Sequence, residues 1–265
     1  MIRELITLTQ GVLKFDSATF IAHIESKDAL KRGLQLIIVV ALLAGFFPFV
    51  GNVINSFTQP NMAAVEQQMQ QQMEMQKQFN PGLRDPQALR IYNETMQGVI
   101  EMVTAIAAIP PNLSFLPGWL GRLLASLGAW LSSPVAWIAG WLGYALWVML
   151  FAKLLGGRAT LSKMLGATTL FAAPHVFNVF TGLLALLGRI PVAGPCLSGL
   201  GVLIGLGLWV WGTVVYVKAT ATANEFGLGK ATLATILPAV LVGLLIALLM
   251  IIWIVFVIIA ASSGH

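Results

Sequence analysis

The sequence predicts an all-α integral membrane protein with five transmembrane helices, and three observations indicate this fold class. Of the 265 residues, 58% are hydrophobic and only 9% are charged, whereas a soluble domain usually carries about a quarter charged residues. Five stretches have the roughly 20 apolar residues that a helix needs to cross a bilayer. Lys and Arg flank these stretches instead of gathering on one soluble face, which favours a membrane protein over a nucleic-acid-binding one.

Residues 1–32 form an amphipathic segment that we expect to lie at the inner face of the membrane, with docking onto a partner as the alternative. Apolar side chains recur at helical spacing from Ile2 onward, and Asp16 or Ser17 could cap a second short helix. Residues 33–57 then form the first transmembrane helix. This stretch is too long, and too far from the N-terminus, for the apolar part of a signal peptide.

Residues 58–112 have the pattern of an extracytoplasmic helical hairpin. Two stretches with one apolar stripe each are separated by a turn at Pro81–Pro86, where two missing amide donors make one continuous helix costly. The stripes, which are also the candidate partner-binding face, comprise Met62, Val65, Met69, Met73, Tyr92, Met96 and Val99. We expect the two arms to pack on each other, and binding of a partner by the methionines is the alternative.

Residues 113–133 resemble an interfacial helix that begins at Pro117 and ends at Pro134, with Trp and Leu on one broad face. Residues 134–265 then form a four-helix membrane domain. Its predicted transmembrane helices are 134–155, 165–188, 197–222 and 232–260. Pro174 and Pro238 are expected to bend the second and fourth of these helices, because neighbouring helices can satisfy a carbonyl that a proline frees.

The distribution of basic residues predicts the orientation. With the N-terminus inside, 10 of the 15 Lys and Arg residues lie on the inner side and 5 lie outside, as the positive-inside rule requires. The sequence therefore predicts a multi-pass protein of the plasma (inner) membrane with a cytoplasmic N-terminus and an extracytoplasmic C-terminus.

The inner loop "GGRATLSK", with Gly156, Gly157 and Arg158, interrupts the apolar sequence. It lacks the second Gly-Lys of a phosphate-binding P-loop and follows a membrane helix instead of a strand. We expect the two glycines to end a helix, and Thr160 or Ser162 to cap the next one.

Groups for catalysis are sparse. No Asp or Glu lies between Glu101 and Glu225, and only three His are present, so the sequence predicts no acid–base pair, no metal site and no cofactor. The candidate polar pocket comprises His175, Asn178, Thr181, Asn52 and Asn55. An ionisable group inside a membrane suggests function, but a hydrogen bond that fixes helix packing is the favoured role of His175.

Two segments, "KLLGGRATLSKMLGATTLFAAP" and "YVKATATANEFGLGKATLATILPAV", resemble the inner loops of the YIP (Ypt/Rab-interacting protein) domain family. In both, a glycine-containing loop precedes a helix that carries a proline. The resemblance implies a five-helix membrane protein of the bacterial type with a trafficking or assembly role. The acidic element of the Rab-binding members is replaced by "SKDALKRGLQL", so GTPase binding is not expected.

The sequence thus predicts a non-enzymatic membrane scaffold or accessory subunit whose partners are membrane lipids and other membrane proteins, but not nucleic acid. The alternative is a passive transporter or lipid-handling bundle with a polar pocket near His175 and Asn178.

Overall fold

A computed structural model describes residues 2–57, 90, 97–98, 117–188 and 194–262, and within these ranges the chain is helical and contains no strand. The predicted hairpin stripes fall outside the described residues, so the hairpin stays a prediction. The chain divides into two compact units, one of Met1–Pro48 and Trp130–His265 and the other of Phe49–Ala129.

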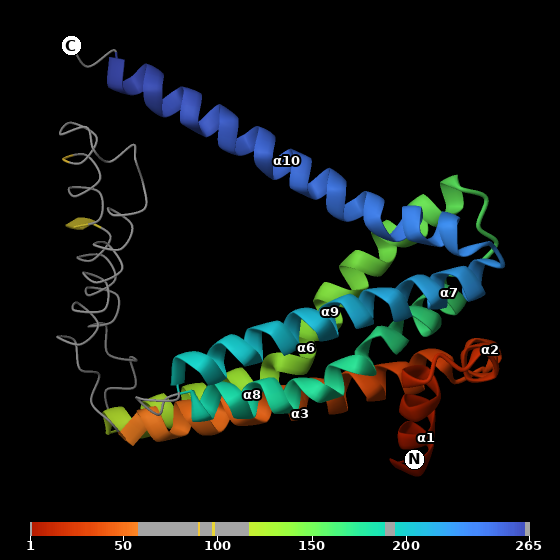
Figure 1. Ribbon diagram of the computed structural model, residues 1–265, viewed down its shortest axis with the longest axis horizontal. Helices are drawn as coiled ribbons and strands as arrows, with labels where there is room; N and C mark the ends of the chain where they lie inside the picture. The colour runs from red at the N-terminus through yellow and green to blue at the C-terminus, as the bar shows by residue number, and fades with distance from the viewer. Residues whose placement is uncertain (1, 58–89, 91–96, 99–116, 189–193, 263–265) are drawn as a thin grey trace. The chain divides into compact units, whose positions relative to one another are not determined.

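The described helices include five that are long and apolar enough to cross a membrane, which confirms the predicted all-helical class and the number of candidate spans. The elements in chain order are α1 (Ile2–Leu13), α2 (Ser17–Glu25), α3 (Ala29–Phe57), α6 (Gly118–Leu154), α7 (Leu161–Thr168), η2 (Thr169–Ala172), η3 (Pro174–Phe177), α8 (Asn178–Leu187), α9 (Gly194–Asn224) and α10 (Leu228–Ser262) (Figure 1).

Two of the helices begin with the capping residues that the sequence predicts. The carboxylate of Asp16 accepts hydrogen bonds from the Ala18 and Thr19 amides at the start of α2. The Thr160 hydroxyl accepts one from the Lys163 amide at the start of α7. Each cap satisfies backbone donors that have no partner within their helix.

The expected end of a helix at Pro134 is wrong, because α6 continues through this proline from Gly118 to Leu154. A proline removes only its own amide donor, and the helix can continue on both sides when other contacts hold it. Here the Trp130 indole donates to the Leu42 carbonyl at 2.9 Å and Ser133 Oγ donates to the Ala41 carbonyl at 3.5 Å. Residues 130–133 therefore pack against α3 as part of the long helix.

The third span is broken instead of merely bent. It runs from Leu161 to Leu187, but two short 3-10 segments, η2 and η3, separate α7 from α8 around Pro174. Proline has no amide to donate, and a 3-10 turn is a common local response to this loss in a membrane helix.

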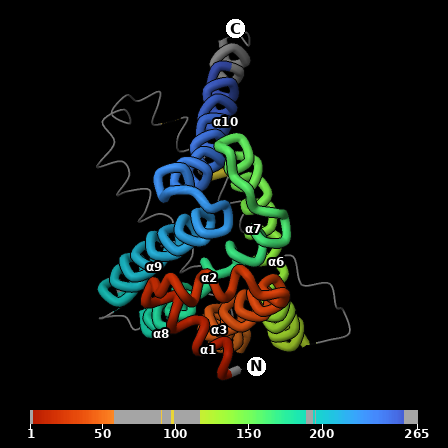
Figure 2. Tube along the Cα trace, turned by 90° about the vertical axis from the view of Figure 1, so that its right-hand side faces the viewer, coloured from red at the N-terminus to blue at the C-terminus, as the bar shows by residue number. Residues whose placement is uncertain are grey.

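Helix α9 is the centre of the larger unit. It packs against α7, both 3-10 segments, α8, α10 and α2, and Figures 1 and 2 both show it alongside α8. Gly201 of α9 lies against Leu184 of α8, whereas the space around Gly205 is open.

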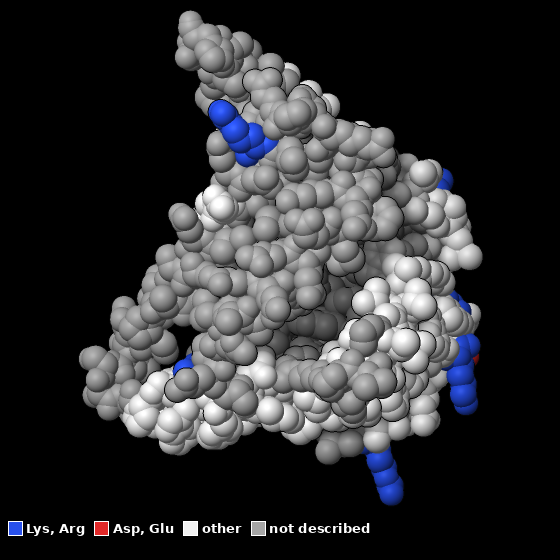
Figure 3. Space-filling model, turned by 60° about the vertical axis from the view of Figure 1, so that its left-hand side comes forward, with Lys and Arg blue, Asp and Glu red and all other residues white. Residues whose placement is uncertain are grey.

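Beyond its first turns, α10 is largely exposed. Its side chains from Val240 to Val255 are all at least 47% exposed, apart from the small Gly243 and Ala247, which are also exposed. On the face drawn in Figure 3, the described surface is largely uncharged, and Lys and Arg project from its margin. Both features suit a protein whose sides meet lipid.

Candidate functional site

The loop after α6 ends this helix with a Schellman motif. Gly156 has a φ of +90°, a conformation that favours glycine. Its amide donates to the Lys153 carbonyl at 3.0 Å, and the amide of Gly157 donates to the Ala152 carbonyl at 2.8 Å. These two bonds have the registers that define the motif, so the expectation that the two glycines end the helix is confirmed.

Asn224, the last residue of α9, joins this loop to the end of α9. Its Oδ1 accepts a hydrogen bond from the Ala159 amide at 3.3 Å, and its Nδ2 donates to the Thr220 carbonyl at 3.0 Å. A Cβ at Gly157 would lie 2.4 Å from Asn224 Oδ1, so only glycine leaves room for the amide. The loop after α6 and the end of α9 therefore meet at one buried side chain; we call this contact the loop junction.

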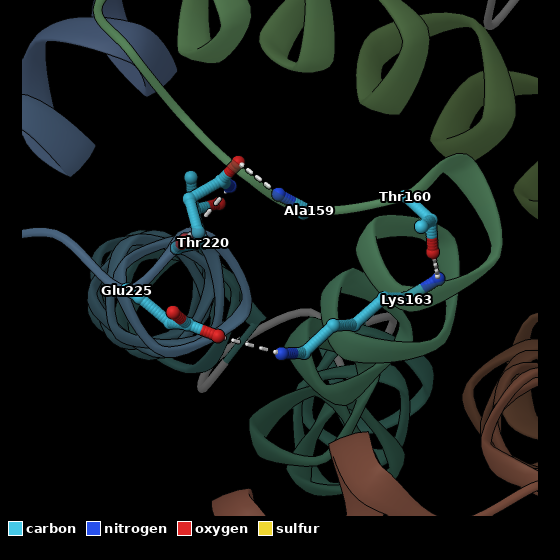
Figure 4. Close-up of polar contacts among 6 residues, drawn as sticks. Ala159, Thr160, Lys163, Thr220 and Glu225 are labelled. Atoms are coloured by element: carbon cyan, nitrogen blue, oxygen red, sulfur yellow. Dashed lines mark hydrogen bonds and ion pairs between the residues drawn. The ribbon is translucent and has the colours of Figure 1, made fainter.

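An ion pair lies at the rim of the loop junction. Lys163 Nζ is 3.3 Å from Glu225 Oε1, and their side chains are 31% and 59% exposed (Figure 4). An exposed pair of this kind contributes about 0–1 kcal/mol, so it orients the loops more than it stabilises them. Arg158 of the same loop is also exposed and adds a positive charge to this loop.

His175 supports the break in the third span. Its Nδ1 lies 3.0 Å from the Phe171 carbonyl. In a 3-10 turn this carbonyl would accept a hydrogen bond from the amide of residue 174, but Pro174 has no amide hydrogen to donate. The ring packs edge-on against Trp137 at 5.5 Å, and a Cβ at Gly212 would approach its Cε1 to 2.4 Å. These contacts correspond to the packing role that the sequence favours over a ligand-binding one.

The other residues of the predicted polar pocket are not all brought together. Asn178 starts α8, and its carbonyl accepts a hydrogen bond from the Thr181 hydroxyl at 2.9 Å. Asn52 and Asn55 are exposed and belong to the second unit, so their pairing with His175 stays a prediction.

A buried polar cluster that the sequence reading missed links four helices. The Trp141 indole donates to Thr168 Oγ1 at 3.1 Å, and the Tyr144 hydroxyl donates to the Thr235 carbonyl at 2.5 Å. Tyr216 of α9 lies edge-on to Tyr144 at 5.5 Å. Hydrogen bonds between membrane helices contribute about 0.6–2 kcal/mol each, so this cluster fixes how α6, α7, α9 and α10 assemble.

Some buried polar atoms of this region have no hydrogen-bond partner among the described residues. They are Trp211 Nε1, Tyr216 Oη, Thr220 Oγ1 and Thr235 Oγ1. Buried groups of this kind call for a bound water, solute or other explanation. The spacing of Tyr216, Thr220 and Asn224, four residues apart, places all three on one face of α9, and this pattern could have revealed the cluster from the sequence.

The N-terminal helices are docked onto the ends of α7 and α9. His23 is only 4% exposed, and its Nε2 lies 3.1 Å from the Gly166 carbonyl. Lys218 of α9 donates to the Phe15 carbonyl and sits 4.9 Å from the centre of the Phe20 ring. Phe15 has a φ of 54°, a conformation that an aromatic residue keeps only where its surroundings hold it, so the Lys218 bond secures the α1–α2 turn.

Burial lowers the pKa of His23 from its ordinary value of 6.5, and the nearby positive charge of Arg32 lowers it further, while the hydrogen bond to Gly166 acts in the opposite direction. His23 is therefore neutral in the docked state at neutral pH. With one carbonyl in contact with Nε2, this nitrogen carries the proton and donates it to the hydrogen bond.

Within the described ranges no three His, Cys, Asp or Glu side chains come together as a metal site. Comparison with models of protein families, with curated proteins and with solved structures gives no match. The function must therefore be inferred from the arrangement of the residues.

Proposed function

We propose that this chain is a non-enzymatic membrane scaffold or accessory subunit that binds other membrane proteins, in a trafficking or assembly role of the kind that the YIP-like loops imply. It would span the plasma (inner) membrane with its N-terminus in the cytoplasm and its C-terminus outside. Its contacts would be with membrane lipids and protein partners, with no role for GTPase or nucleic-acid binding.

The exposure of α10 is the observation that carries this proposal. Of the 18 consecutive residues of this helix with the highest mean hydropathy, only 6% are buried, compared with 22–28% in the other four spans. From Val240 to Val255, the side chains of α10 are largely uncovered by the described residues. This stretch offers a large surface to the helices of a partner, and Gly243 would allow a close approach there.

Photo-crosslinking in native membranes tests the proposal. A crosslinking amino acid at Leu245 or Leu249 of α10, both 55% exposed, should yield a discrete adduct with another membrane protein. Leu203 of α9, 66% exposed, is the matched control and should yield lipid adducts. If all three positions give only lipid adducts, α10 faces lipid and the scaffold proposal fails.

The orientation is tested separately by cysteine labelling. On a Cys196→Ser background, Arg84→Cys should react with an impermeant reagent only from outside, and Arg158→Cys only from inside. Reversed labelling would overturn the proposed sidedness.

A passive transporter or lipid-handling bundle is the second candidate. The unpartnered buried atoms of Tyr216, Thr220 and Thr235 favour it, because polar groups inside a membrane commonly line a path for a solute or headgroup. Proteoliposomes should then show lipid scrambling or solute flux that Tyr216→Phe or His175→Ala reduces. Unchanged flux in variants with altered stability would mean that the cluster serves packing alone.

A further inference from the structure

A cavity of about 400 Å³ lies between α1, α2 and the first turns of α3. All three helices belong to the same compact unit. Its charged and amide-bearing lining residues are Arg3, Glu4, His23, Arg32 and Gln35. Leu5 and Leu8 provide an apolar side.

The charge of this lining is positive. Arg3 and Arg32 contribute two positive charges and Glu4 one negative charge, while His23 is neutral and bound to a backbone carbonyl. Among the described residues, neither guanidinium group takes part in an ion pair or a hydrogen bond; the bonds that involve these two arginines use their backbone atoms. Two guanidinium groups thus line one cavity with their donors available.

The cavity also lies at a suitable depth. Helix α3 has 29 residues, and at 1.5 Å per residue it is about 43 Å long. This length matches the roughly 40–45 Å of a bilayer with its headgroups. The first turn of α3, which carries Arg32, therefore lies at headgroup level when α3 spans the membrane.

From this geometry we propose that the cavity binds a phosphate group, carried by the headgroup of an anionic phospholipid or by a soluble phosphate. Guanidinium groups recognise phosphate oxygens through paired, charge-assisted hydrogen bonds. Gln35 lines the same wall. The aliphatic side of the cavity suits the glycerol and first methylenes of a lipid. This site is independent of the scaffold function and of the exposed surface of α10.

The test uses the purified full-length protein in a zwitterionic-lipid nanodisc and measures its thermal unfolding. Phosphatidylglycerol, phosphatidylcholine with the same acyl chains and inorganic phosphate are added in separate arms. A ligand that binds only the folded state raises the Tm, and we expect phosphatidylglycerol to raise it by about 2–4 °C. Equal shifts with both lipids would overturn the site.

Matched variants identify the cavity as the source of the shift. The double variant Arg3→Gln/Arg32→Gln should lose it. The control Lys14→Gln/Lys27→Gln removes the same charge from two exposed residues outside the cavity and should retain it. If both double variants behave alike, the Tm shift depends on the total charge of the protein and not on the cavity, and the proposal is wrong. A shift with inorganic phosphate alone, lost in the arginine variant, would support the site and assign it to a soluble phosphate.

A helical circular dichroism spectrum without added lipid confirms that each variant is folded. If the arginine variant does not fold, Arg32→Lys, which keeps the charge but loses the planar fork, takes its place. It should at least halve the shift caused by phosphatidylglycerol, and an unchanged shift would contradict recognition by the guanidinium group.

Discussion

The third and fifth spans of this protein differ in how much of each is buried among the described residues. The most apolar 18 residues of the third span, Leu161–Leu187, have a mean hydropathy of 1.8, and 28% of them are buried. The corresponding 18 residues of the fifth span have a mean hydropathy of 2.9, and 6% of them are buried. The third carries Thr168, His175 and Gly182, all in contact with neighbouring helices. Apolar surface gains nothing by leaving lipid for protein, so small and polar residues drive packing. The less apolar helix is accordingly the more buried one.

The largest expected difference between these spans comes from removing a leucine. Leu170 in the third span is 0% exposed. Leu170→Ala should lower the unfolding free energy by about 2–5 kcal/mol, because the surrounding helices cannot close the cavity that it leaves. Leu245→Ala, at a residue of α10 that is 55% exposed, should change it by no more than about 0.5 kcal/mol. Unfolding in mixed detergent and SDS micelles measures both. Equal losses would show that α10 is packed as tightly as the third span.

Glycine contacts give the next largest effect. Gly212→Ala should cost about 1–3 kcal/mol, because its Cβ would meet the His175 ring. Gly207→Ala on the same helix has open space around it and is the control, expected to be neutral or mildly stabilising. The same SDS titration applies. Adding His175→Ala to Gly212→Ala should recover part of the loss, and failure to do so would place the strain elsewhere.

A smaller effect is expected for the polar cluster. Thr168→Val removes the acceptor of the Trp141 indole and should cost about 1 kcal/mol. Thr232→Val on α10 is the control, because this hydroxyl donates only to a carbonyl of its own helix, that of Leu228. A double-mutant cycle of Thr168→Val with Trp141→Phe should give a coupling energy of similar size. A coupling near zero would mean that the two residues contribute independently.

The smallest effect concerns pH and the docking of α2 onto the third span. Because the pKa of His23 is lowered in the folded protein, the stabilising contribution of its neutral form is complete above pH 6.5 and decreases as the pH falls toward the lowered pKa. The unfolding free energy should therefore be lower at pH 5.5 than at pH 7.5. His23→Gln, which keeps a side-chain donor, should reduce this difference. Hydrogen bonds from Thr19 lower the pKa of Asp16 from its ordinary value, so its titration does not contribute in this range.

Features that depend on nearby residues could be predicted from the sequence. Hydropathy finds the five spans, and the caps formed by Asp16 and Thr160 follow from residue type and position. The two glycines after α6 also reveal the end of this helix. Each of these features is determined within a few residues, where spacing and backbone preference are sufficient.

Features that depend on distant residues could not be predicted in this way. Continuation of α6 through Pro134 depends on bonds from Trp130 and Ser133 to α3, 88 and 92 residues away. The role of His175 was predicted as packing, but its contact with Gly212 requires the placement of α9. The cavity beside α1 needs three helices in place, and neither Arg3 nor Arg32 belongs to a recognisable motif.

The loop junction also has a consequence for how the protein is made. Asn224 follows its partner Ala159 by 65 residues, and at a synthesis rate of about 5–20 residues per second this separation takes roughly 3–13 seconds. During that interval the third span has emerged without α9, the helix against which most of it packs. We therefore expect nascent chains that end before α9 to leave the side of the third span that packs on α9 open to the insertion machinery. Completion of α9 would be the step that releases the bundle from it.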